Sequence, residues 1–117
     1  MSNFPSKAWY QRLQQRVNQD QDFKEAARWF NGTVGWRVDD QQTNLGISGQ
    51  QVADLSENGD DIAFGMSGSL EVWRELLAKG TINRLYRQGK IQILGDKVEA
   101  MRFWKVLWYL TENARAL

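Results

Sequence analysis

The sequence predicts an α+β domain in which helices cover a five-stranded, mainly antiparallel sheet. Five short segments alternate apolar and small or polar residues, as strands do, whereas the segments between them space their apolar residues as helices do. Capping or turn residues stand at nearly every junction. The predicted order is helix, four strands, two helices, a fifth strand and a last helix. With 117 residues and no linker or repeat, we expect one domain over residues 1–117.

The first 30 residues predict a bent helix or helical hairpin. Pro5 suits the first turn of a helix, and Ser6 is a residue that helps to cap it. Apolar residues then recur at helical spacing, stop at 18–21, and restart. These positions are Trp9, Leu13, Val17, Phe23, Ala27 and Phe30. We expect this thinly apolar arm to cover the sheet; a moving lid is the less favoured alternative.

Three consecutive strands are predicted between residues 33 and 55. In residues 33–39, Val34, Trp36 and Val38 fall on one face and polar or small residues fall on the other. Leu45 and Ile47 indicate a second strand, and residues 52–55 indicate a third. Turn-forming residues lie between these segments, so we expect a meander that ends in a turn at residues 57–60.

Residues 61–95 predict a strand, two helices and another strand. The first strand alternates Ile62, Phe64 and Met66 with small residues, and Ser69 then caps a helix that Gly80 ends. Thr81 caps a second, shorter helix, which Gly89 ends. Apolar residues on these two helices have helical spacing. They are Leu70, Trp73, Leu77, Ile82, Leu85 and Tyr86. Residues 90–94 alternate again as a fifth strand.

The last helix is predicted from Asp96, which has Glu99 three residues later as in a capping box, to about Asn113. Its apolar residues sweep an arc of roughly 220° at the helical period. They are Ala100, Met101, Phe103, Trp104, Val106, Leu107, Trp108 and Leu110. A helix that lies on a sheet needs an apolar stripe of only about 100°. We therefore expect a second apolar neighbour, which is a ligand or another subunit, unless the other helices cover the whole arc.

Composition excludes several classes of function. The 15 basic and 14 acidic residues nearly balance, so nothing indicates binding of duplex nucleic acid. Histidine and cysteine are both absent, which removes imidazole bases, thiol nucleophiles and the commonest zinc ligands. The paired carboxylates, Asp39–Asp40 and Asp60–Asp61, are expected on solvated turns. We therefore expect no catalytic residue, no metal site, no cofactor and no enzymatic activity.

No apolar run is long enough for a membrane span, and residues 1–5 do not start a signal peptide. The chain ends in Ala114-Arg115-Ala116-Leu117, which is not a peroxisomal signal. We therefore expect a soluble protein of the cytoplasm, without an integral membrane segment.

The C-terminal half resembles the sterol carrier protein type 2 domain family. The resemblance lies in a tryptophan-containing helix that ends at Lys79-Gly80, a short helix with Tyr86, and the segment 88–96, Gln-Gly-Lys-Ile-Gln-Ile-Leu-Gly-Asp, before Ala100-Met101. The N-terminal half agrees only in the order of its elements. The resemblance implies a lipid-binding α/β fold with sheet order 3-2-1-4-5.

Resemblance and periodicity together predict an apolar ligand between the sheet and the C-terminal helices. The expected ligand is a fatty acyl chain, an acyl thioester or a sterol-like lipid, and the expected activity is binding or transfer. The predicted ligand-binding residues are Phe64, Met66, Trp73, Leu77, Ile82, Leu85, Tyr86, Met101, Trp104, Leu107 and Trp108. Arg84, Arg87 and Lys90 could meet a polar head group, although a solvated face is the favoured interpretation.

The last helix departs from the family pattern. Phe103, Trp104, Trp108 and Tyr109 are bulkier than the small and aliphatic residues usual there, so they could fill a tunnel that relatives leave open. The alternative function is therefore a protein-interaction or accessory module of the same fold, serving lipid or quinone metabolism. Both a monomer and a homodimer through the C-terminal helix are compatible with the sequence.

Overall fold

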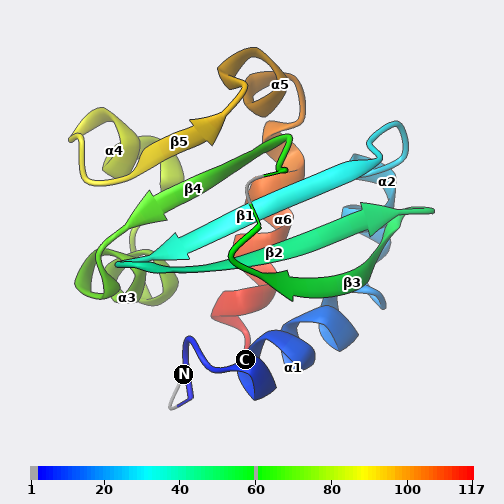
Figure 1. The fold of residues 1–117 in the computed structure, drawn as a ribbon, viewed down its shortest axis with the longest axis horizontal. Helices are drawn as coiled ribbons and strands as arrows, with labels where there is room; N and C mark the ends of the chain where they lie inside the picture. The colour runs from blue at the N-terminus through cyan, green and yellow to red at the C-terminus, as the bar shows by residue number, and fades with distance from the viewer. Residues whose placement is uncertain (1–2, 60) are drawn as a thin grey trace.

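A computed structural model describes residues 3–59 and 61–117, so predictions that involve Met1, Ser2 or Asp60 lie outside the described residues. Figure 1 shows a twisted sheet with helices behind it. The helices are α1 Lys7–Val17, α2 Gln21–Ala26, α3 Leu70–Ala78, α4 Ile82–Arg87, α5 Lys97–Arg102 and α6 Trp104–Arg115. The strands are β1 Gly32–Val38, β2 Gln41–Ser48, β3 Gln51–Glu57, β4 Phe64–Gly68 and β5 Gln92–Gly95. This order confirms the predicted α+β class, with the first and last helices each divided in two.

The sheet has the strand order β3-β2-β1-β4-β5 that the family resemblance implies. The β1–β2, β2–β3 and β4–β5 pairs are antiparallel, whereas β1 and β4 are parallel. The sheet is therefore mixed and mainly antiparallel. The parallel pair forms because the chain leaves β3 at one edge and crosses the sheet before it enters β4 beside β1.

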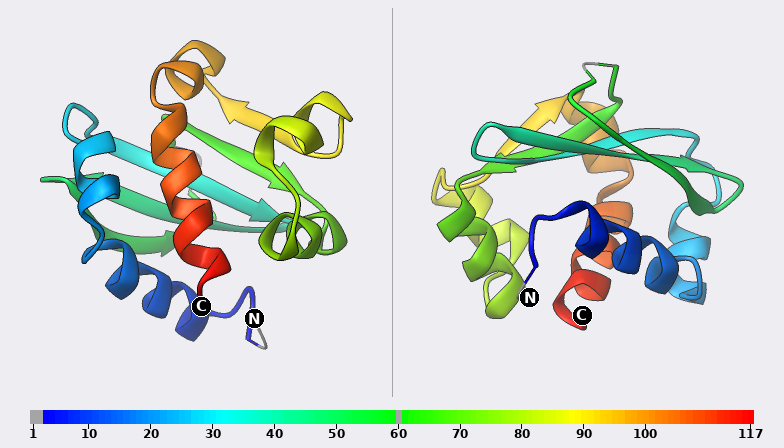
Figure 2. Two further views of the ribbon diagram at one scale, coloured as in Figure 1. Left: turned by 180° about the vertical axis from the view of Figure 1, so that it is seen from behind. Right: turned by 60° about the horizontal axis from the view of Figure 1, so that its bottom comes forward.

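The helices lie on one face of the sheet, as the tilted view in Figure 2 shows. On that inner face, Val34 pairs with Phe64 and Trp36 pairs with Met66 across the parallel strands. All four side chains are buried. The predicted inward faces of these two strands are therefore correct from Phe64 onward.

The outer face of the sheet is crossed by the connection between β3 and β4. Gln42 and Asn44 donate side-chain hydrogen bonds to the carbonyl oxygen of Gly59, at 2.9 and 3.0 Å. Ile62 Cδ1 lies 3.1 Å from the position that a Cβ would take on Gly35, whose outward side is free of a side chain. Ile62 therefore lies over the outer face before β4 begins, so the prediction that it shares a face with Phe64 and Met66 is wrong.

The N-terminal arm is a packed covering element. Ser6 Oγ accepts a hydrogen bond from the Trp9 amide at 3.2 Å, so α1 begins at Lys7 and Pro5 precedes the cap instead of occupying the first turn. The buried residues of α1 face the sheet, and Asn18 then binds the edge strand β3 through both backbone groups of Val52, at 3.1 and 2.7 Å. These contacts satisfy edge groups that would otherwise stay open.

The predicted caps of the C-terminal half are confirmed. Ser69, Thr81 and Asp96 each accept a hydrogen bond from an amide three residues later. Strand β5 begins two residues later than predicted, because the amides of Lys90 and Ile91 still close the turn onto the Leu85 carbonyl.

The last helix is not continuous, contrary to the prediction. Phe103 has φ −109° and ψ 33°, outside the helical range, and it separates α5 from α6. Neither glycine nor proline marks this bend. The bend accompanies packing of the Phe103 ring on Phe30, with centroids 5.0 Å apart. A projection of 97–113 as one helix therefore combines two faces that point in different directions, and the 220° arc does not exist as a single surface.

Candidate apolar ligand site

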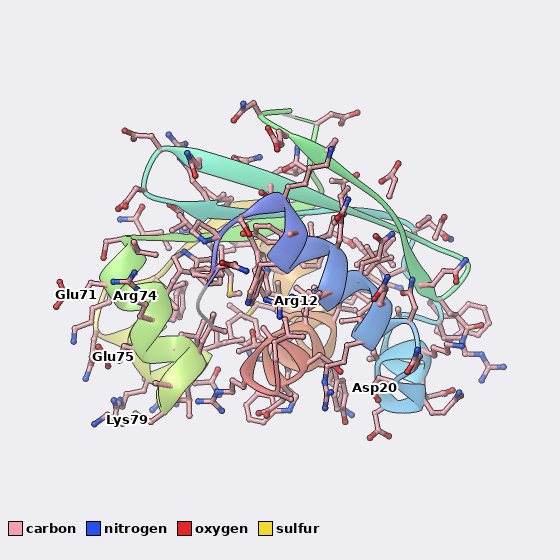
Figure 3. All side chains as sticks on the ribbon, turned by 90° about the horizontal axis from the view of Figure 1, so that it is seen from below. Arg12, Asp20, Glu71, Arg74, Glu75 and Lys79 are labelled. Atoms are coloured by element: carbon pink, nitrogen blue, oxygen red, sulfur yellow. The ribbon has the colours of Figure 1, made fainter. Side chains whose placement is uncertain are left out.

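The predicted ligand space lies between the inner face of the sheet and the helices α3 and α6. Strand β4 supplies Phe64 and Met66, α3 supplies Trp73 and Leu77, and α6 supplies Leu107, all of them buried. Figure 3 shows the charged residues of α3, such as Glu71 and Arg74, on the opposite, outer side of that helix. The amphipathic pattern of α3 thus directs its aromatic and aliphatic residues toward the sheet.

The eleven predicted residues divide by burial into three groups. Seven are buried in one apolar core, and they are Phe64, Met66, Trp73, Leu77, Ile82, Leu85 and Leu107. Tyr86 and Trp104 are half-buried and pack against that core. Met101 is 49% exposed and Trp108 is 37% exposed, so these two lie on the surface. The structure therefore collects nine of the eleven residues in or against the core.

Tyr86 and Trp104 meet between α4 and α6. Their ring centroids are 6.4 Å apart in an edge-on arrangement. Trp108, one turn further along α6, borders a small cavity of about 10 Å³ with Ile82 and Arg115. Arg115 also donates hydrogen bonds to the carbonyl oxygens of Leu76 and Gly80, which fixes the end of α6 against the end of α3. Trp108 is thus separated from the groove described next.

A surface groove of about 800 Å³ lies where α2 meets the α5–α6 bend. Aromatic and apolar residues form much of its lining, with charged residues among them. The lining residues are Asp22, Glu25, Ala26, Trp29, Met101, Arg102, Phe103, Trp104, Lys105 and Tyr109. Trp29 is 76% exposed. The sequence did not identify Trp29 as a site residue, because a single tryptophan after a short helix belongs to no run of regularly spaced apolar residues.

A stack of three aromatic rings connects this groove with the core. Phe103 lines the groove, and its ring centroid is 5.0 Å from that of Phe30. The ring of Phe30 is in turn 5.2 Å from Phe64, which belongs to the predicted ligand set. The groove and the predicted ligand space are therefore joined by aromatic side chains, and Phe103 stands at the surface end.

A second aromatic cluster fills the interior beneath α1. Trp36 lies 4.8 Å from Trp73, 6.2 Å from Tyr10 and 6.3 Å from Trp9 between ring centroids. Phe4 packs edge-on against Trp9 at 4.6 Å. The sequence predicted that bulky residues of the last helix, such as Phe103 and Trp104, fill the interior. The fully buried tryptophans are instead Trp9, Trp36 and Trp73.

Tyr10 closes this cluster toward solvent. Burial raises the pKa of its hydroxyl well above the ordinary value, although a hydrogen bond with Thr43 opposes the shift. Both residues border a second groove, of about 560 Å³, between the start of α1 and strands β2 and β3. Its lining is mostly polar, which makes it a poorer match for an apolar ligand than the groove at the α5–α6 bend.

Charged side chains that the sequence singled out lie on a turn or in ion pairs. Asp39 lies on the β1–β2 turn, where its carboxylate accepts a hydrogen bond from the Leu70 amide at 3.2 Å. Arg84 and Lys90 both pair with Glu75, at 3.3 and 3.7 Å. Among the described residues, no group of three acidic side chains is placed to hold a metal ion. The described helices also include none with the length and apolarity needed to span a bilayer.

Three solved structures illustrate the similarity of the fold. A crystal structure of sterol carrier protein 2 is 15% identical, with 94% of this chain and 95% of that chain covered, at a TM-score of 0.83. Palmitated SCP2L2 from Aedes aegypti is 18% identical over 84% and 89% of the two chains, at 0.58. The ubiquinone synthesis protein UbiJ-SCP2 is 18% identical over 89% and 83%, at 0.61. At such identities the likeness establishes the fold alone.

Comparison with curated protein sequences gave no match. The model of the SCP-2 sterol transfer family, in contrast, matches residues 10–107, which is most of the chain and includes both the sheet and the α5–α6 bend. This chain therefore belongs to the SCP-2 sterol transfer family.

Proposed function

We propose that this chain binds an apolar ligand between the sheet and the C-terminal helices and transfers it without chemical change. The ligand is a fatty acyl chain, an acyl thioester or a sterol-like lipid. The observation that carries the proposal is the apolar path from the groove at Phe103, through Phe30, to Phe64 in the core. Family membership supports it, as does the fold shared with a palmitated relative.

The packed interior is compatible with this function on energetic grounds. An empty cavity of ~300 Å³ would cost ~7 kcal/mol, comparable with the whole stability of a domain. A ligand-free carrier is therefore expected to collapse onto its own side chains. Twelve methylenes of an acyl chain contribute a gross ~10 kcal/mol on burial, which exceeds the ~0.5–1.5 kcal/mol of one displaced aromatic pair.

In this proposal Phe103 is the movable element. Its ring is half-buried, it stands at the bend between two short helical segments, and its neighbours in the groove are partly exposed. A ring that turns outward would open the route along Phe30 toward Phe64. The eleven predicted residues would then line the bound chain, with Met101 and Trp104 at the mouth and Phe64, Met66 and Trp73 inside. Trp108 does not line this mouth and borders the small cavity beside Ile82 instead.

We further propose that the protein catalyses no reaction, needs no cofactor and acts in the cytoplasm. Broad esterase, thioesterase and phosphatase assays should find no activity above background. Activity that survives repurification and disappears in Asp61→Asn would overturn this part of the proposal.

The test is thermal unfolding of delipidated protein with and without long-chain fatty acid below its micelle concentration. Ligand that binds only the folded state adds about 2.7 kcal/mol of stability at a hundredfold excess over Kd, so the melting temperature should rise by several degrees.

Met101→Lys places a charge at the groove and should reduce this rise in melting temperature. Val98→Lys is the matched control, because Val98 is also on α5 but is 76% exposed and does not line the groove. No rise with fatty acids, acyl thioesters or sterols would refute the carrier function.

A protein-interaction module is the second candidate. The exposure of Trp29 and Met101 beside one groove favours it, since apolar surface of this kind also occurs where partners bind. Such a module would dimerise through the C-terminal helix or assist lipid or quinone metabolism, as the name of the similar ubiquinone synthesis protein indicates for that protein. Size-exclusion chromatography with light scattering distinguishes the two, because a lipid-free dimer supports the module and a lipid-loaded monomer supports the carrier.

A further inference from the structure

Two indole N–H groups in the core have no hydrogen-bond acceptor among the residues that the structure describes. Trp9, Trp36 and Trp73 are all fully buried, and Trp73 Nε1 donates to the Arg37 carbonyl at 2.8 Å. Within residues 3–59 and 61–117, neither Trp9 Nε1 nor Trp36 Nε1 has a partner. A buried donor without an acceptor keeps its full desolvation cost, so such groups are rare and require an explanation.

The two donors lie beside the proposed ligand space. Trp9 comes from α1 and Trp36 from β1, and their ring centroids are 6.3 Å apart. Trp36 is in turn 4.8 Å from Trp73, which is one of the predicted ligand-binding residues. Trp36 also pairs in register with Met66, another member of that set. A ligand that reaches Met66 and Trp73 would therefore end close to both indoles.

The residues around the two indoles determine which kind of hydrogen-bond acceptor fits there. An indole N–H donates only, so its partner must be an acceptor. The rings around the two indoles are those of Phe4, Tyr10 and Trp73, and among the described residues neither indole N–H reaches the Tyr10 hydroxyl or any other acceptor. An ionised carboxylate buried among aromatic rings would lose far more solvation free energy than hydrogen bonds from two neutral donors would restore. An uncharged oxygen, in a hydroxyl, an ester or a thioester, loses much less.

We propose that Trp9 and Trp36 donate hydrogen bonds to an uncharged oxygen at the polar end of the bound lipid. The proposal rests on the proposed carrier function and adds the orientation of the ligand. The polar end lies beneath α1, and the hydrocarbon chain extends along β4 toward Phe64 and the groove at Phe103. A fully apolar molecule of the same length would fill the space but leave both donors unpaired.

The experiment compares dodecan-1-ol and methyl laurate with dodecane, each delivered from cyclodextrin to delipidated protein. The quantity measured is the ratio of affinities for the polar-ended and the fully apolar probe. Trp9→Phe and Trp36→Phe remove the donor and keep an aromatic ring, so each should lower this ratio about tenfold. Trp29→Phe is the control, because Trp29 is 76% exposed and lies outside the buried cluster beneath α1, and it should leave the ratio unchanged.

A spectroscopic readout on the wild type makes the test independent of how well the variants fold. With ¹⁵N-labelled tryptophan, the indole N–H resonances of Trp9 and Trp36 should shift downfield with dodecan-1-ol and much less with dodecane. The proposal would be overturned if these chemical shifts did not change with dodecan-1-ol and the indole N–H groups showed contacts to a buried water. Equal affinity ratios in the wild type and both donor variants would also overturn the proposal. In that case the carrier function would still hold, because the wild type would have bound the probes. If no probe binds the wild type, the carrier function fails together with this inference.

Discussion

Replacement of Phe103 by alanine tests whether the aromatic stack is the entrance to the core. Phe103 is half-buried and contacts Phe30 at a ring-centroid distance of 5.0 Å. A fully buried Phe→Ala change costs about 3–5 kcal/mol, so about half of that, or roughly 1.5–2.5 kcal/mol of unfolding free energy, is expected here. For a domain of this size the melting temperature should fall by roughly 5–15 °C.

The same change should accelerate ligand uptake. Loss of one aromatic pair removes about 0.5–1.5 kcal/mol of the opening cost, which corresponds to a rate about two- to tenfold higher. Stopped-flow tryptophan emission with fatty acid measures this rate. Trp29→Ala is the control, because Trp29 lines the same groove but is 76% exposed and stays outside the stack. If folded Phe103→Ala takes up ligand no faster than the wild type, the route through Phe103 is wrong.

Three further predictions concern the scaffold. Asp96→Ala removes the acceptor of two amides, at 2.9 and 3.2 Å, and should lower the unfolding free energy in urea by about 0.5–2 kcal/mol; a neutral result would contradict the capping role. Gly65→Ala places a Cβ 2.1 Å from the Gly35 carbonyl oxygen, so it should destabilise the β1–β4 pair more than Asp96→Ala does, and equal melting of the two variants would count against that contact. Burial raises the pKa of Tyr10 above its ordinary value of 10.0, so the stability it contributes is fully present below that pH and is lost as the pH rises above it. Tyr10→Phe should therefore flatten the alkaline loss of stability, and an unchanged alkaline limb would show that Tyr10 does not cause it.

Local signals in the sequence were sufficient for most of the elements. Ser69, Thr81 and Asp96 were predicted as caps and are caps, because an N-cap depends on hydrogen bonds within one turn. The inward faces of β1 and of β4 from Phe64 follow from strict alternation over short segments. The parallel pairing of β1 with β4 joins segments about 30 residues apart. Only the family resemblance implied that these two strands are neighbours, and their parallel direction was not predicted, since periodicity contains no information on such distant pairs.

Contacts between distant residues explain what the sequence analysis missed. The apolar spacing continues through Phe103 without a break, so nothing local marks the bend that packing on Phe30 accompanies. Ile62 continues the alternation of β4 yet lies on the outer face, over the backbone of Gly35. Trp9 and Trp36 were recognised as core residues of a helix and a strand. That their N–H groups have no partner among the described residues becomes evident only when the acceptors around each ring are known.

Native mass spectrometry of the freshly purified protein tests the carrier function most directly. We expect a monomer with the added mass of one fatty acid, acyl thioester or sterol-like lipid, which organic extraction removes and incubation with the same lipid restores. A bare monomer or a dimer that carries no lipid, and that takes up none when these lipids are added, would contradict the account.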